Sequence, residues 1–206
     1  MNIALGTIAF GTAVDEKDTF AILDRFAEAG GTMLDTAEGL SAAAIAKAAE
    51  GSLQRLRTDY IDVYWSHIED RSVPVEETLG AFDELARQGR IRSSGASNLA
   101  TWRVERARNL SAARGWLPYT YLQLRHTYLR PRPLTRLAEA GHTLATDETL
   151  EYVRAEPDVT LWVYNTLMAG AYTRADRPIP EIYHHPGTTR RLAVLREVAA
   201  EVGAAC

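Results

Sequence analysis

Six short runs of β-type residues recur along the chain, and each is followed by a segment with helical spacing. The runs lie at residues 5–10, 32–35, 60–66, 91–97, 119–124 and 159–164. The first five begin 27 to 31 residues apart, which is enough for a strand, a helix and two turns. The last interval, of 40 residues, contains Arg130-Pro131-Arg132-Pro133, which we interpret as a surface excursion. Such alternation predicts a parallel sheet covered by helices.

Apolar stripes and end signals indicate where the helices lie. Apolar side chains fall at helical spacing in residues 18–29, 44–56 and 75–87. Asp15 and Ser41 are suited to cap the first two helices, and Gly30-Gly31 and Gly89 to end the helices before them. A further helix is expected at residues 99–108, with Ser97-Asn98 as its candidate N-cap pair, and the last at residues 188–202.

A doubly wound sheet and a (β/α)₈ TIM-type barrel both satisfy this alternation. The residues after the first run, 10–14, do not fit the G-x-G-x-x-G pattern of a dinucleotide-binding sheet. Polar residues cluster instead where successive runs end, at Asp35, His67, Ser97-Asn98, Gln123 and Tyr164. Because the active site of a barrel lies at the C-terminal ends of its strands, we predict a barrel.

Composition excludes several classes of protein. With 23 basic and 27 acidic residues the net charge is −4, which lacks the basic footprint of a nucleic-acid binder. No apolar run approaches the ~18 residues that cross a bilayer, and the N-terminus does not resemble a secretory signal, so we expect a cytoplasmic protein. The only cysteine, Cys206, excludes an internal disulfide, and the adjacent His184-His185 lack the spacing of metal ligands.

Several segments, in order, resemble the aldo-keto reductase family. They are Leu5-Gly6-Thr7-Ile8-Ala9-Phe10-Gly11, Gly31-Thr32-Met33-Leu34-Asp35-Thr36-Ala37, Thr58-Asp59-Tyr60-Ile61-Asp62 running to Ser66-His67, Gly89-x-Ile91-Arg92, Gly95-Ala96-Ser97-Asn98 and Tyr164-Asn165-Thr166-Leu167-x-x-Gly170. The resemblance implies a (β/α)₈ barrel and the reduction of an aldehyde or ketone by hydride from NADPH. We therefore expect residues 1–206 to form a single aldo-keto-reductase-like barrel domain.

The resemblance also assigns residues to the site. Asp35 matches the family's catalytic aspartate and His67 the histidine that orients the carbonyl. Ser97 and Asn98 match the pair that hydrogen-bonds the nicotinamide carboxamide, with Gln123 as the third amide-reading group. Tyr164 matches the aromatic residue that stacks on the nicotinamide ring. The loop with Asn165, Thr166, Leu167 and Gly170 matches the pyrophosphate loop, and Thr7 and Ile8 match the backbone beneath the ribose.

Simpler roles compete with these assignments. Asp35 could cap the following segment, His67 could be an ordinary loop histidine, and Tyr164 could be a core residue. Arg125, His126, Arg130 and Arg132 form a basic cluster that is either a solvated surface or a contact for phosphate or an acidic substrate.

The sequence departs from the family in two places. No tyrosine lies between Asp35 and Tyr60, and the two lysines, Lys17 and Lys47, fall on helical segments, so the family's catalytic tyrosine and lysine have no counterpart. The last strand and its basic loop also have no counterpart, which leaves about six of eight strands. Either the barrel is shortened and remodelled, or segments of a longer protein are omitted. In-register joins and the cost of open sheet edges favour omission.

We predict an NADPH-dependent oxidoreductase acting on a small carbonyl compound, with no nucleic-acid, membrane or metal partner. One alternative is an inactive barrel that binds the nicotinamide cofactor or a partner without turnover. A second copy of the chain is a candidate partner, because oligomerisation would cover open sheet edges. Another alternative uses Asp35 and His67 as an acid–base pair for chemistry without a redox step.

Overall fold

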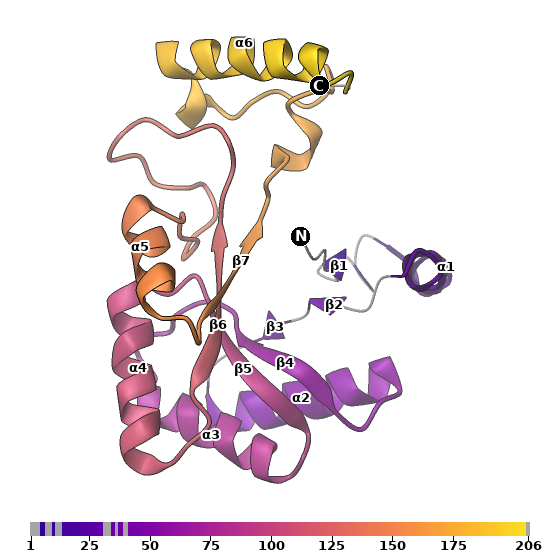
Figure 1. The fold of residues 1–206 in the computed structure, drawn as a ribbon. Helices are drawn as coiled ribbons and strands as arrows, with labels where there is room; N and C mark the ends of the chain where they lie inside the picture. Colours follow the sequence, from indigo (N-terminus) through magenta and orange to yellow (C-terminus); the bar gives the residue numbers. More distant parts are fainter. Residues whose placement is uncertain are drawn as a thin grey trace.

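The computed structural model describes residues 5–6, 10, 14–30, 34–35, 37–38 and 41–204 and shows an α/β fold (Figure 1). The elements, in chain order, are β1 Leu5–Gly6, α1 Glu16–Glu28, β2 Leu34–Asp35, β3 Ala37–Glu38, α2 Ala42–Leu56, β4 Ile61–Ser66, α3 Val75–Arg87, β5 Ile91–Ser97, α4 Thr101–Arg114, β6 Tyr119–Arg125, α5 Asp147–Ala155, β7 Thr160–Tyr164, the 3₁₀ helices η1 Met168–Gly170 and η2 Glu181–Tyr183, and α6 Pro186–Glu201. Within these ranges, none of the helices combines the length and apolar character needed to cross a bilayer.

The strands form two parallel sheets. Five of them are hydrogen-bonded in the order β3-β4-β5-β6-β7, which is also their order along the chain, and β1 pairs with β2 separately. Parallel neighbours in chain order, joined by helices, are the arrangement of a barrel wall. The sheet is unclosed among the described residues, as expected for a barrel with fewer strands than eight.

One face of the five-stranded sheet buries the main apolar core. Figure 1 shows α2, α3 and α4 packed along this face. Tyr64 of β4 and Leu122 of β6 belong to one buried cluster with Leu79 and Phe82 of α3, and these side chains are at most 3% exposed. The ring centroids of Tyr64 and Phe82 lie 5.5 Å apart, edge to face. Each fully buried large apolar side chain stabilises the fold by about 1.5–3 kcal/mol, so this layer holds the sheet to its helices.

The opposite face carries aromatic side chains, because successive residues of a strand point to opposite sides. The Trp65 ring lies 5.4 Å from that of Trp162 and 6.1 Å from that of Tyr121, between centroids. Gly95, on the strand between them, makes room for Trp65: a Cβ atom there would lie 2.4 Å from Trp65 Cε3. This aromatic cluster of Trp65, Tyr121 and Trp162 fills the side that would face the inside of a barrel.

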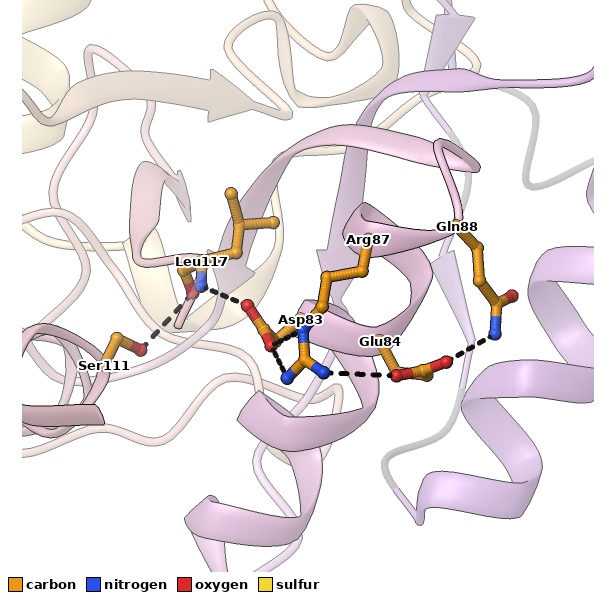
Figure 2. Close-up of polar contacts among 6 residues, drawn as sticks. All are labelled: Asp83, Glu84, Arg87, Gln88, Ser111 and Leu117. Carbon is orange, nitrogen blue, oxygen red and sulfur yellow. Dashed lines mark hydrogen bonds and ion pairs between the residues drawn. The ribbon is translucent and has the colours of Figure 1, made fainter. Parts of the chain in front are cut away.

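At the N-terminal end of β6, a polar network ties α3 to α4. Figure 2 shows Asp83 between Arg87, on its own helix, and the backbone of Leu117. The Leu117 amide donates to Asp83 Oδ1 at 3.0 Å, and Ser111 Oγ donates to the Leu117 carbonyl at 3.3 Å. Arg87 Nε donates to Asp83 Oδ2 at 2.7 Å. Asp83 is 6% exposed, and both of its carboxylate oxygens accept hydrogen bonds. This network therefore stabilises the packing of α3 and α4 at this end of the sheet.

Most expected elements are confirmed, with two exceptions. Asp15 caps α1 and Ser41 caps α2 through their side-chain oxygens, as predicted. Ser97-Asn98 as the N-cap of α4 is wrong: Ala100 holds that position without a side-chain bond. Helix α5 was missed within the interval interpreted as a surface excursion, although Thr146 and Thr149 form a capping box there.

We expect Gly95→Ala to destabilise the fold by about 1–3 kcal/mol, because the added methyl group must displace the Trp65 ring. Urea denaturation measures the effect. Gly80→Ala is the matched control: its Cβ would lie an ordinary 3.6 Å from Trp116, inside α3, where alanine stabilises by about 0.5–1 kcal/mol relative to glycine. Equal effects of the two substitutions would contradict the packing described for Trp65.

Candidate functional site

The predicted site residues that the structure describes with their side chains converge at the C-terminal ends of four neighbouring strands. His67 follows β4, Ser97 ends β5, Gln123 lies near the end of β6, and Tyr164 ends β7. Since the strands are parallel, these ends meet at one edge of the sheet. Ser97 Oγ donates to Gln123 Oε1 at 3.0 Å, which joins β5 to β6 there.

Asn98 is the centre of this edge. Its Nδ2 donates to Ser97 Oγ and to the His67 carbonyl, both at 3.1 Å. Its Oδ1 accepts from the Thr143 amide at 3.1 Å and from the Tyr164 hydroxyl at 2.7 Å. An asparagine side chain has two N–H donors and two lone pairs, so its hydrogen-bonding capacity is used in full. The backbone of Asn98 is left-handed, with a φ of 60°, a conformation that asparagine tolerates better than most residues.

Tyr164 is held from several sides. Its hydroxyl lies 2.8 Å from His142 Nδ1 in addition to Asn98, and its ring meets the His142 ring edge to face at 5.7 Å. The guanidinium carbon of Arg125 lies 5.8 Å from the centre of the Tyr164 ring. Burial raises the pKa of Tyr164, and the Arg125 charge opposes that rise. The phenol is therefore protonated near neutral pH.

Arg125 is not part of a solvated surface. It is 8% exposed, and its Nη2 pairs with Glu139 Oε1 at 2.7 Å. The hydrogen bond from Arg125 lowers the pKa of Glu139. The interpretation of the basic cluster as a solvated surface therefore does not hold for Arg125. Its charge is neutralised by the carboxylate of Glu139.

His142 is a site residue that the sequence did not indicate. It lies in the connection between β6 and α5, and its ring packs edge to face against that of His67 at 6.1 Å. The connection returns to the strand ends because the backbone of Arg125 bonds to both Thr143 and Ala145. Burial lowers the pKa of His142, helped by the charges of Arg125 and His67 and opposed by Glu139.

The loop after β7 presents backbone amides. Asn165, Met168, Ala169 and Gly170 have φ values of 58°, 48°, 53° and 88°. Within the described part of the chain, the amides of Thr166 and Leu167 make no hydrogen bond, and Leu167 is 71% exposed. Turns that leave several N–H groups free form concavities that bind anions. Among the same residues, no three His, Cys, Asp or Glu side chains converge as metal ligands.

Three predicted site residues are described in part or not at all. Asp35 ends β2 in register with Gly6, in the two-stranded sheet, and its side chain lies outside what the structure describes. Thr7 and Ile8 lie outside the described residues altogether. The pairing of Asp35 with His67 therefore stays a prediction.

We expect the fold to gain stability as the pH rises from about 5 to about 7. Burial holds the pKa values of His142 and His126 below 6.5, so in this range the unfolded chain binds more protons than the folded one. Urea midpoints measured against pH test this. The double variant His126→Asn/His142→Asn should flatten the rise; an unchanged rise would contradict it. Glu139 does not affect this range: because its pKa is lowered in the folded state, its contribution to stability is present above pH 4.5 and is lost only as the pH falls below that value.

Comparison with known proteins places this arrangement in a family. The profile of the aldo/keto reductase family matches residues 37–204. An aldo-keto reductase of Fusarium vanettenii is 42% identical over 85 residues, which are 41% of this chain and 23% of that protein. The versiconal hemiacetal acetate reductase of Aspergillus parasiticus is 35% identical over 91 residues, 44% of this chain and 26% of that enzyme.

Longer matches agree with the fold. An uncharacterised oxidoreductase of Bacillus subtilis, YrpG, is 28% identical over 155 residues, covering 51% of this chain and 48% of its own length. The crystal structure of a protein assigned as a 2,5-diketo-D-gluconic acid reductase B superposes with a TM-score of 0.64 at 21% identity, over 81% of this chain and 62% of that one. The chain thus covers less than half the length of these sequence relatives. On the match across residues 37–204, the chain belongs to the aldo/keto reductase family.

Proposed function

We propose that this chain takes part in the NADPH-dependent reduction of an aldehyde or ketone by hydride transfer. The observation that carries the proposal is the hydrogen-bonded cluster at the ends of β4 to β7, with Asn98 at its centre, in a chain of the aldo/keto reductase family. The reductase names of the Fusarium and Aspergillus relatives support the same reaction class. The substrate we propose is a small carbonyl compound.

The residues present fit a nicotinamide dinucleotide in part. The amides of Thr166 and Leu167, which bond to none of the described residues, suit a pyrophosphate. Ser97 and Gln123 supply amide-recognising groups at the neighbouring strand ends. Asn98 already uses both its donors and both its acceptor positions within the protein. Its contribution in this proposal is to orient Ser97 and Tyr164, and a direct bond to a carboxamide would require it to exchange a partner. When bound, the cofactor supplies the hydride.

The chain's own residues prepare the reacting region. His67 is proposed to hold the carbonyl oxygen, and its place is fixed by the bond from Asn98 to its backbone. Trp162 lies opposite Gln123 in the sheet register, so the aromatic cluster is next to the hydrogen-bonded cluster around Asn98. Apolar walls of this kind keep water out, and hydrogen bonds and charges act more strongly where water is excluded.

A second candidate function is cofactor binding without turnover. It is favoured by the positions of the two lysines, because Lys17 lies on α1 and Lys47 on α2, both exposed. Neither is at the strand ends that form the site, where the family's reaction uses a lysine beside its catalytic phenol. Under this second function the strand ends hold the nicotinamide, and no proton donor completes the reaction.

Titration of the purified chain with NADPH, followed by nicotinamide fluorescence, tests both functions. We expect binding, and Ser97→Ala should weaken it about tenfold, because one hydrogen bond contributes about 1–1.5 kcal/mol. Ser111→Ala is the matched control, since Ser111 is a buried serine with one bond at the far end of the sheet (Figure 2). It should leave the affinity unchanged.

Turnover separates the two functions. The same protein is given NADPH with a panel of aldehydes and ketones, and absorbance of the reduced nicotinamide is followed. Consumption of NADPH supports reduction, whereas binding without consumption supports the second candidate. Absence of binding by the wild-type chain would contradict both.

A further inference from the structure

The partners of Asn98 fix the direction of the hydrogen bonds that Tyr164 makes with Asn98 and with His142. The Asn98 NH₂ group must face the His67 carbonyl, which only accepts, and Oδ1 must face the Thr143 amide, which only donates. Exchanging the two ends of the amide would oppose acceptor to acceptor and donor to donor. Oδ1 is therefore the atom that lies 2.7 Å from the Tyr164 hydroxyl, and the hydroxyl donates its one proton there.

The same assignment of donors and acceptors determines which nitrogen of His142 carries the proton. Once the Tyr164 proton is directed to Asn98, the Tyr164 oxygen can only accept from His142 Nδ1, 2.8 Å away. Neutral His142 is thus the Nδ1–H tautomer, and its Nε2 carries a lone pair. Which nitrogen of a histidine is protonated is set in this way by the bond that the other nitrogen makes.

The Nε2 atom of His142 is available to a ligand. It makes no hydrogen bond with the part of the chain that the structure describes, and it is not among the fully buried polar atoms without a partner. The ring packs against His67 at 6.1 Å between centroids, so an oxygen bound by one imidazole lies near the other. His67 is also the residue to which the resemblance assigns the carbonyl oxygen.

The charged and titratable groups around His142 come from four segments. Arg125 lies on β6, Glu139 on the same connection, His67 after β4, and Tyr164 on β7. Burial lowers the pKa of His142, the charges of Arg125 and His67 lower it further, and Glu139 opposes them. The imidazole is accordingly neutral near pH 7, with its Nε2 lone pair free to take a proton.

We propose that Nε2 of His142 is the proton acceptor of this site for an alcohol substrate, and the proton donor in the reverse direction. The assignment rests on the function proposed above. In alcohol oxidation the carbinol C–H pair leaves as hydride to an oxidised nicotinamide dinucleotide. The O–H bond breaks, its electron pair forms the second C–O bond, and the proton passes to Nε2. In carbonyl reduction the imidazolium returns that proton to the oxygen as the hydride arrives.

The tautomer is tested without turnover. In ¹⁵N-labelled protein the ring-nitrogen shifts of His142, identified by the signals missing in His142→Asn, separate a protonated from an unprotonated nitrogen. We expect Nδ1 protonated and Nε2 unprotonated at pH 7. Tyr164→Phe removes the acceptor of the Nδ1 proton and should shift the population toward Nε2–H, while His184→Asn, on an exposed imidazole, should change nothing at His142. A wild-type Nε2–H tautomer would overturn the proposal.

His142→Asn then separates proton transfer from positioning. The asparagine amide can replace the Nδ1 donor to Tyr164, but it has no counterpart of Nε2. We expect kcat for alcohol oxidation to fall about 100-fold or more, with loss of the acidic limb of its pH profile and unchanged NADPH affinity. His184→Asn should retain wild-type kcat. If His142→Asn kept the wild-type kcat, the role of His142 would be overturned, and the proposed reduction would not be affected.

A wild-type chain that binds NADPH without turnover would overturn both the proton transfer and the proposed reduction. The nitrogen shifts would still report the tautomer in that case. The failure of His142 as a proton acceptor is thereby distinguishable from the failure of the proposed function.

Discussion

The side-chain amide of Asn98 is the interaction on which the candidate site depends. Its four hydrogen bonds join the segment after β4, the end of β5, the end of β7 and the connection before α5. Each such bond contributes about 1 kcal/mol, but a buried polar group that loses its partner costs about 1–3 kcal/mol. Because Asn98 is 4% exposed, a change at any one of these segments leaves a buried group unpaired. The strand ends therefore hold their relative positions together.

The Asp83 network and the candidate site lie at opposite ends of the same sheet. At the start of β6, Asp83 fastens the α4–β6 turn to α3 through bonds that leave none of its oxygens free (Figure 2). At the opposite edge, the loop after β7 has two backbone amides, and the β6–α5 connection has an imidazole nitrogen, that make no hydrogen bond with the described residues. Parallel sheets with helical crossovers favour this division, because the loops after the strands vary without disturbing the core.

Local patterns predicted what local physics decides. The period of strands and helices, and the caps Asp15 and Ser41, follow from residues close together in the sequence, and the structure confirms them. Ser97-Asn98 as a helix cap is wrong because Asn98 binds Thr143, 45 residues away, in place of the helix that follows it. His142 carries no local signal at all: its place depends on a connection that folds back onto β6. Contacts between distant segments are what the sequence left undetermined.

The absence of a lysine from the described strand ends bears on which group can move a proton there. A phenol has an ordinary pKa near 10, so it needs a neighbouring cation to exchange a proton near pH 7. An imidazole titrates near pH 6.5 and needs no such neighbour. Arg125 lies beside Tyr164, but Glu139 neutralises it, and burial raises the pKa of the phenol despite the arginine. The energetically easier proton donor at this edge is the imidazole that Tyr164 orients. In the proposed reaction Tyr164 is therefore a positioning residue, and His142 transfers the proton.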